Sequence, residues 1–402
     1  MSPDVAASPP PKHADAVVIG GGCIGASIAF HLAVRGIGRV CLIEKEGLAS
    51  AATGRSTGII RVHYSHETMA RMALRSLETF QHFDDVIGGE VGFQPCGWLL
   101  GVGSADAGAL RMIVSMLREL GANTRELSPA ELAEQEPGIN LDGVAAVAFE
   151  PDCGYADPYL TTMAFAARAR ALGAAIVLST TVTGIREDRG RVQGVETNQG
   201  YVAAPVVVNA AGDWAPALAR LAGAELQVRT TSHPIYILRR AADDLSPRSI
   251  YTDFVNGVYF KPEPGPPLVL GLIGPPERAF SEPVSGFCQP WLDHEIIEDF
   301  ARRSIGRFPS LAQAGYQGGY VATYDETPDQ HFLLGALPPL EGMYVAAGFS
   351  GHGFKHCPVV GAMLAELIDT GACREFDIRM FRPTRFDEGD FVRGRYVYSA
   401  AA

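Results

Sequence analysis

The chain has 402 residues, 47% of them hydrophobic, so it is long enough to bury one large core or two moderate ones. Its 45 acidic residues outnumber its 33 basic ones, which gives a formal net charge of −12. No run of Lys or Arg could follow a phosphate backbone, so nucleic acid is not expected as a partner.

The seven cysteines are scattered and never spaced as CxxC, which argues against a disulfide framework or a structural zinc site. We expect no bound metal and a reducing, cytoplasmic location. The small, Pro-rich residues at positions 1–14 predict a disordered leader. No run reaches the roughly 18 apolar residues that a membrane span needs, so none is expected.

The first motif is "DAVVIGGGCIGASIAFHLAVRG". Its apolar run from Ala16 to Ile19 predicts a strand, and the apolar residues up to Val34 recur at helical period. Gly20, Gly22 and Gly25 lie between them at GxGxxG spacing. The pattern predicts a strand, a tight turn and a helix whose N-terminus can receive a pyrophosphate.

A second predicted strand, in "RVCLIEKE", ends at Glu44, which is placed to accept hydrogen bonds from ribose hydroxyls. Gly20 would permit the turn, Gly22 the close approach of a phosphate, and Gly25 the close packing of helix on strand. The alternative is a glycine-rich turn of any α/β protein, but the complete unit favours a Rossmann-type dinucleotide site.

The same fingerprint serves NAD and FAD, so the following segment has to distinguish them. "GLASAATGRSTGIIRVHYSHE" is rich in glycine and small residues, as if the backbone wrapped closely around a large flat group. This favours a flavin. The segment resembles the D-amino-acid oxidase and sarcosine oxidase family of FAD enzymes, and "TGRSTGIIR" is most similar to the sarcosine oxidase β-subunits.

The middle of the chain changes pattern. We predict a helix from about residue 105 to 120, then a short helix capped by Ser128 with Glu131 in an S-x-x-E box. Asp157 and Pro158 have the residue types of a helix N-cap and first turn. "VVVNAAGDW" is similar to the family's second FAD-contacting strand, although an ordinary strand-to-helix junction would read the same way.

Residues 226–321 alternate β-branched and aromatic residues with Pro and Gly clusters, which predicts an antiparallel sheet. We therefore predict an α/β fold, α+β overall, with two domains. The FAD-binding domain takes residues 15–85, 141–225 and 322–372, and the substrate domain takes residues 86–140 and 226–321. A C-terminal tail follows at 373–402.

The stretch "YDETPDQHFLLGALPPLEGMYVAAGFSGHGFKHCPVV" carries the most specific resemblance, since its "TPD" and "GFSGHGFK" motifs are similar to those of sarcosine oxidases and dehydrogenases. In that family a neutral amine passes a hydride to flavin N5. The loop from Gly351 to Phe354, just before a helix, would offer N–H groups to the reduced flavin.

Four residues are expected to act on the substrate. By motif position, Arg61 and Lys355 match the pair that holds the substrate carboxylate in monomeric sarcosine oxidases, and Tyr324 matches an active-site tyrosine. His352 lies in the flavin loop. The alternatives are solvated surface charges for the two cations and a structural role for the tyrosine.

The motif positions also give the residues expected to bind FAD. They are Gly20, Gly22, Cys23, Ile24, Gly25, Glu44, Lys45, Ser50, Thr53, Gly54, Arg55, Ser56, Thr57, Gly58, Ile59, Val182, Ala210, Gly212, Trp214, Gly348, Gly351, His352, Gly353, Phe354 and Lys355.

Three positions depart from the family pattern. Ala322 stands where the monomeric enzymes link flavin through cysteine, so non-covalent FAD is expected. Ala156 stands where the β-subunits attach a second flavin through histidine. Val269 stands where the oxidases carry a lysine thought to assist oxygen, so the electron acceptor is either oxygen or another molecule.

Together these features predict an FAD enzyme that oxidises the C–N bond of a secondary or N-methylated amino acid, or another amine, to an imine. One alternative is a 2-hydroxy acid dehydrogenase on the same scaffold. Another is a flavin subunit that is inactive without partner chains. A monomer or small oligomer is expected.

Overall fold

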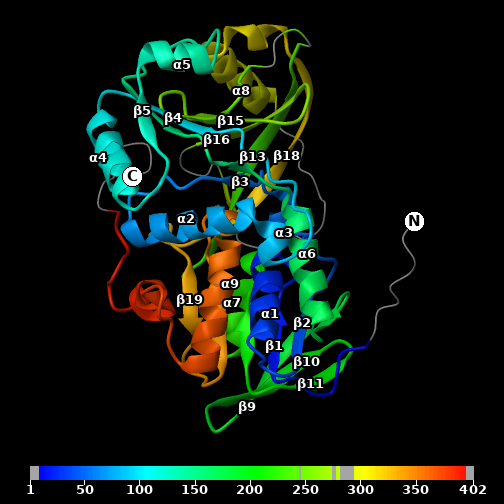
Figure 1. The fold of residues 1–402 in the computed structure, drawn as a ribbon. Helices are drawn as coiled ribbons and strands as arrows, with labels where there is room; N and C mark the ends of the chain where they lie inside the picture. The colour runs from blue at the N-terminus through cyan, green and yellow to red at the C-terminus, as the bar shows by residue number, and fades with distance from the viewer. Residues whose placement is uncertain (1–8, 242, 244–245, 274–277, 281–293, 395–402) are drawn as a thin grey trace.

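The computed structural model describes residues 9–241, 243, 246–273, 278–280 and 294–394. Two large sheets organise this part of the chain. In Figure 1 the sheet that contains β1 and β2 lies below with helices α1, α7 and α9, and the sheet that contains β13 and β18 lies above with helices α4, α5 and α8.

The lower sheet has six strands in the order β19-β20-β12-β1-β2-β8. All neighbouring strands are parallel except β19 and β20. The predicted strand at residues 16–19 is confirmed as β1. The strands are β1 (Ala16–Ile19), β2 (Val40–Ile43), β8 (Ala175–Val177), β12 (Val207–Asn209), β19 (Leu333–Ala336) and β20 (Met343–Ala347).

Both faces of this sheet are covered by other elements, so strand residues that point to opposite sides are all buried. Ala16 and Val18 of β1 pack with helices on one face, whereas Val17 and Ile19 pack with a three-stranded sheet and α7 on the other. The helices of the first face are α1 (Cys23–Val34), α2 (Glu67–Gln81), α3 (Phe83–Val86), α6 (Pro158–Ala171) and α9 (Gly353–Thr370). The elements of the second are β9 (Val182–Asp188), β10 (Arg191–Thr197), β11 (Gly200–Ala203) and α7 (Ala215–Leu221).

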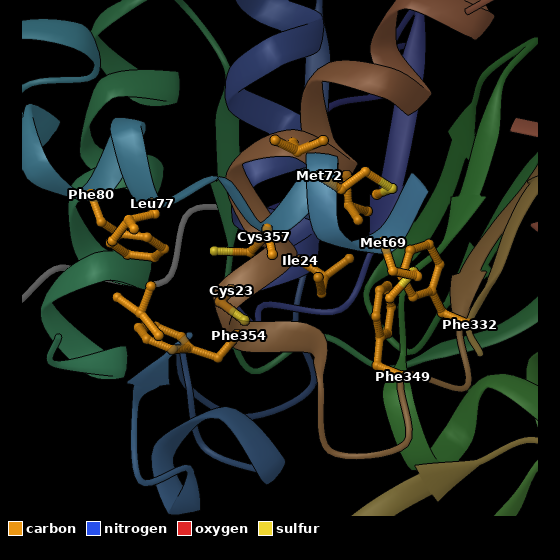
Figure 2. Close-up of a cluster of buried hydrophobic side chains, with 14 of the residues drawn as sticks. Cys23, Ile24, Met69, Met72, Leu77, Phe80, Phe332, Phe349, Phe354 and Cys357 are labelled. Atoms are coloured by element: carbon orange, nitrogen blue, oxygen red, sulfur yellow. The ribbon is translucent and has the colours of Figure 1, made fainter. Parts of the chain in front are cut away.

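Figure 2 shows the apolar cluster at the meeting point of α1, α2 and α9. Ile24 of α1, Phe354 of α9 and Met69 of α2 are buried there. Because α9 comes more than 300 residues after α1, this packing ties the two ends of the chain into one unit.

The upper sheet has nine strands and takes pieces from both halves of the chain. Its order is β17-β13-β16-β15-β14-β4-β6-β5, with β18 on the free side of β13. The strands are β4 (Trp98–Val102), β5 (Arg125–Leu127), β6 (Ala146–Glu150), β13 (Arg229–Arg239), β14 (Ile250–Asp253), β15 (Val258–Pro262), β16 (Pro267–Leu272), β17 (Arg278–Phe280) and β18 (Gly315–Glu326). It is antiparallel as predicted except that β4 and β14 run parallel.

The predicted helices of the middle region are confirmed. They are α4 (Ala107–Glu119) and α5 (Pro129–Gln135), and α8 (His294–Arg307) lies later in the chain. Ser128 and Glu131 form the complete capping box, and the Asp157 side chain accepts from the N–H groups of Tyr159 and Leu160. Local sequence therefore determined where these helices begin.

The predicted domain bounds differ from the sheets at two places. β6 and the last residues of β18 belong to the upper sheet, whereas the sequence pattern predicts that residues 141–225 and 322–372 belong to the FAD-binding domain. Residues 1–8 of the predicted leader lie outside the described residues, whereas Lys12 and Ala14 hydrogen-bond to the backbone of Ala203.

Part of the predicted tail is also held against the protein. The Arg385 guanidinium forms a buried ion pair with Asp329 at 2.8 Å, and Phe381 stacks on Phe332. Residues 395–402 lie outside the described residues. Within the ranges that are described, no helix is long and apolar enough to cross a membrane.

Candidate active site

A cavity of about 950 Å³ lies where the two sheets meet. Its lower walls are the turn after β1, the end of β2, the end of β12 and residues 50–59. Its upper walls come from β13, β15 and β18, and the loop before α9 closes one side. The volume is at the upper end of the usual range for small-molecule sites, about 300 to 1,000 Å³, as a dinucleotide requires.

The glycines of the β1–α1 turn are required by close contacts. Gly20 has φ +114°, and a Cβ there would lie 2.4 Å from the Ala210 carbonyl oxygen. A Cβ on Gly25 would lie 2.0 Å from the Gly20 oxygen. α1 begins on the cavity with no acidic residue in its first turn, so the positive end of its dipole is available to an anion.

Glu44 and Lys45 lie beside this turn at the end of β2. The Glu44 carboxylate accepts from the Gly21 N–H at 2.6 Å and from the Glu46 N–H at 2.8 Å, and each oxygen keeps a further lone pair. The Lys45 ammonium lies 3.4 Å from the centre of the Trp214 ring. This contact joins β2 to the predicted second FAD strand.

Residues 50–59 connect the nucleotide end to the upper sheet. The segment begins with a 3-10 turn, Ala52–Arg55, and Thr53 Oγ1 accepts from the Cys23 N–H at 3.2 Å. Tyr320 of β18 donates to the carbonyl of Arg55 at 3.1 Å. The segment therefore follows the cavity wall from α1 to β18.

Arg61 and Lys355 line the same cavity, although they are far apart in the chain. The Arg61 guanidinium donates to the His63 carbonyl and lies 4.5 Å from the centre of the Tyr64 ring. Lys355 lies in the first turn of α9 and is only 6% exposed. Neither cation has an ion pair with an acidic residue anywhere in the described ranges.

The loop before α9 is tied to β18. Asp325 accepts from the Gly348 N–H at 2.7 Å, and burial, followed by the nearby Asp213 carboxylate, raises the pKa of Asp325 to about 7. Gly351 has φ +76°, and a Cβ there would lie 2.6 Å from the Tyr324 ring. Burial lowers the pKa of His352 well below its usual range, so its ring is neutral.

The cavity wall above this loop is aromatic. Tyr324 stacks on His233 with ring centres 3.8 Å apart, and His233 Nε2 lies 3.4 Å from a Glu326 carboxylate oxygen. Burial, and then Glu326, raises the pKa of Tyr324 to about 12, so it is a neutral hydrogen-bonding group. Tyr259 lies on the same wall and is also buried, with a raised pKa.

His233 and Tyr259 were missed by the sequence analysis. The only available signal was the alternation on β13, which places Thr231, His233 and Ile235 on one face. The alternation does not show which face of β13 lines the cavity, because that depends on where the lower sheet lies.

All four residues expected to act on the substrate line this one cavity: Arg61, Tyr324, His352 and Lys355. Most residues expected to bind FAD line it as well. They are Gly20, Gly22, Cys23, Ile24, Glu44, Lys45, Ser50, Thr53, Arg55, Ser56, Thr57, Ile59, Val182, Ala210, Gly212, Trp214, Gly351, Gly353 and Phe354.

Four glycines expected at the cofactor do not line the cavity: Gly25, Gly54, Gly58 and Gly348. Each allows two chain segments to approach instead. A Cβ on Gly58 would lie 2.1 Å from the Ala156 oxygen, and one on Gly54 would lie 2.3 Å from the Ala49 oxygen. At these sites the missing side chain allows the segments that form the cavity wall to pack closely.

The cavity fits FAD in its donors as well as in its size. A dinucleotide needs an anion site for its pyrophosphate, and the N-terminus of α1 provides one. The flavin ring needs donors where negative charge develops on reduction. The N-terminus of α9 also opens on the cavity, with no acidic residue in its first turn.

Comparison with known proteins supports this assignment. The chain is 31% identical over 368 residues to 4-methylaminobutanoate oxidase (formaldehyde-forming) of Paenarthrobacter nicotinovorans, covering 90% of this chain and 44% of that protein. It is 29% identical over 401 residues to human mitochondrial sarcosine dehydrogenase, covering 96% of this chain and 43% of that protein. The chain thus spans less than half the length of these two relatives.

A solved structure agrees over nearly the whole fold. L-proline dehydrogenase from P. horikoshii superposes with a TM-score of 0.86 at 28% identity, covering 95% of this chain and 100% of that one. A family model described as FAD dependent oxidoreductase, DAO, matches residues 15–367. The chain therefore belongs to the DAO family of FAD-dependent oxidoreductases.

Proposed function

We propose that this enzyme oxidises the C–N bond of a secondary or N-methylated amino acid to an imine. The observation that carries the proposal is the pair of basic side chains, Arg61 and Lys355, that line the cavity with no acidic partner among the described residues. FAD, when bound, would supply the redox chemistry as the acceptor of the hydride from the C–H bond next to the nitrogen. The chain supplies binding and orientation.

The cation pair suits a carboxylate better than an uncharged group. The Arg61 guanidinium offers a planar fork of N–H donors, and the Lys355 ammonium a compact charge. Each charge-assisted hydrogen bond contributes about 1.5 to 3 kcal/mol. Amino acids should therefore be bound in preference to simple amines.

The opposite wall suits the amine end of the substrate. Tyr324 and Tyr259 are neutral phenols, and Ala322 and Ile235 beside them are apolar and line the cavity too. This mixture can hold an N-alkyl group and an uncharged nitrogen together. The named activities of the relatives support this class, since those proteins act on sarcosine, on 4-methylaminobutanoate and on L-proline.

Anaerobic bleaching of the flavin colour tests the substrate class. A panel should contain N-methyl amino acids, proline, primary amino acids, amines without a carboxylate, and 2-hydroxy acids. We expect the N-methylated and secondary amino acids to bleach the protein fastest. Faster bleaching by 2-hydroxy acids would replace the proposal with a hydroxy acid dehydrogenase, and bleaching only with added partner chains would indicate a dependent subunit.

Substitution tests the carboxylate site. Arg61→Ala and Lys355→Ala should each lower kcat/KM for the amino acid by about 10- to 150-fold and leave an amine without a carboxylate nearly unchanged. The double variant should lose less than the product of the two, because both cations serve one carboxylate. Equal losses for both kinds of substrate would show that these residues serve the flavin or the fold.

We further propose a cytoplasmic location. Six cysteines in the described ranges are free thiols, which supports a reducing compartment, and Cys288 lies outside those ranges. Any disulfide trapped by alkylation at lysis would contradict this location.

A further inference from the structure

The two buried lysines of this chain have opposite surroundings. The sequence contains four lysines, and Lys261 and Lys355 are both only 6% exposed. The Lys261 ammonium is ion-paired with Glu263 and lies 4.1 Å from the centre of the Tyr155 ring. The Lys355 side chain, in contrast, has no hydrogen bond or ion pair to any residue in the part of the chain that the structure describes.

The groups around Lys355 are cationic or neutral. Arg61 comes from the segment after β3 (Ile59–Ile60), and His352 and His356 lie on either side of Lys355 at the start of α9. His331, just before β19, lies near these two histidines. Tyr64 contributes a ring 5.2 Å from that of His356. An ammonium ion at Lys355 would therefore be buried beside the like charge of Arg61, among imidazole rings that are neutral.

The acids on neighbouring elements are bound elsewhere. Glu150 of β6 lies 3.3 Å from His63 Nδ1 and accepts from the Val62 N–H. On β18, Asp325 accepts from the Gly348 N–H, while Glu326 pairs with His233 and with Arg229. None of these carboxylates compensates Lys355.

Burial in this position destabilises the charged form of Lys355 relative to the neutral form. Burial lowers the pKa of the Lys355 ammonium well below its usual range, and the nearby Arg61 guanidinium lowers it further. The neutral Lys355 amine can therefore act as a base, and an anion bound beside it would raise its pKa again.

We propose that Lys355 is uncharged in the empty site and accepts the proton that the substrate ammonium must lose before its C–N bond is oxidised. This rests on the proposed function, since it requires an amino acid substrate. A secondary alkylamine has a pKa near that of free lysine, about 10, and so arrives protonated. A protonated nitrogen has no lone pair to assist departure of the hydride.

The proton balance is complete within the site. The amino acid brings a carboxylate and an ammonium group. One N–H bond of the substrate breaks and one forms at Lys355 Nζ, either directly or through one water. The product of this transfer is a neutral amine whose carboxylate faces two cations, Arg61 and protonated Lys355. The total charge of the complex does not change.

A pair of isosteric ligands can test this by calorimetry on the FAD-loaded enzyme in buffers of different ionisation enthalpy. Pivalate carries a carboxylate and no ionisable amine. 2-Aminoisobutyrate has an ammonium group in place of one methyl and no hydrogen on Cα, so its α-carbon cannot be oxidised. At pH about 8, the enzyme should take up about one proton from solution when pivalate binds, and close to none when 2-aminoisobutyrate binds.

Variants identify the group that takes the proton. In Lys355→Met and in Lys355→Arg, uptake with pivalate should vanish, because neither side chain can gain a proton. Lys261→Met is the matched control and should keep the uptake of the unmodified enzyme. In Lys355→Arg, amino acid oxidation should persist only at higher pH, where the substrate itself is deprotonated.

The outcomes separate the two proposals. Binding of pivalate without proton uptake would show that Lys355 is already charged and would overturn this inference alone. Uptake that persists in Lys355→Met would assign the proton to another group and would also overturn it. Failure of both ligands to bind would reject the carboxylate site, and this inference with it.

Discussion

Gly25 offers a sharp test of how the β1–α1 turn binds the cofactor. A Cβ at this position would lie 2.0 Å from the Gly20 oxygen, whereas real Cβ atoms essentially never come within 3.0 Å of a non-bonded heavy atom of another residue. In Gly25→Ala, α1 must therefore move by about 1 Å from the turn. The helix N-terminus would no longer meet the pyrophosphate correctly.

The expected magnitudes follow from two opposing effects. Alanine in a helix interior is favoured over glycine by about 1 kcal/mol, while overpacking costs about 1 to 3 kcal/mol. The variant without FAD should lose at most about 2 kcal/mol of unfolding free energy. FAD affinity should fall by about 10- to 150-fold, because at least one charge-assisted hydrogen bond to phosphate is lost.

Gly108→Ala in α4 is the matched control, since a Cβ there meets nothing within 4 Å and the residue lies outside the cavity lining. It should gain helix stability without any change in FAD binding. Urea unfolding of the FAD-free proteins and quenching of flavin fluorescence measure the two quantities. Equal FAD affinity in the two variants would refute the role of Gly25.

Three further predictions concern the cavity. Because Ala322 lines the cavity and offers no nucleophile for a covalent link, acid precipitation should release the yellow colour into the supernatant, and a pellet that stays yellow would contradict non-covalent binding. Because Val269 provides no positive charge, dye or quinone should reoxidise the flavin faster than oxygen, and stopped-flow rates in air equal to those with dye would be inconsistent with this. Asp325 has a raised pKa of about 7, so it holds a proton in the folded protein that the unfolded chain, with a pKa of about 4, has lost. Its stabilisation is complete below pH about 4 and disappears as the pH rises through about 7. In the unmodified protein the free energy of unfolding should therefore fall by up to about 4 kcal/mol between pH about 4 and pH above 7, and Asp325→Asn should remove this fall. Urea unfolding at several pH values measures it, and an unchanged fall in the variant would assign it to another group.

The sequence by itself determined the local units of this protein. The strand at Ala16–Ile19, the GxGxxG turn, the capping box of Ser128 and Glu131, and the cap at Asp157 all depend on residues close together in the chain. Neighbouring residues supply the hydrogen bonds and the backbone freedom that these units need. The resemblance of the motifs then indicated the family and FAD.

Only the tertiary structure decided which distant residues meet. Nothing near β4 in sequence predicts its parallel pairing with β14, and nothing near β13 shows that His233 would stack on Tyr324. The same holds for charge. Lys261 and Lys355 are equally buried, but Glu263 lies beside the first, whereas segments more than 200 residues apart place Arg61 near the second. The protonation of a buried lysine depends on those neighbours, because desolvation and nearby charges set its pKa.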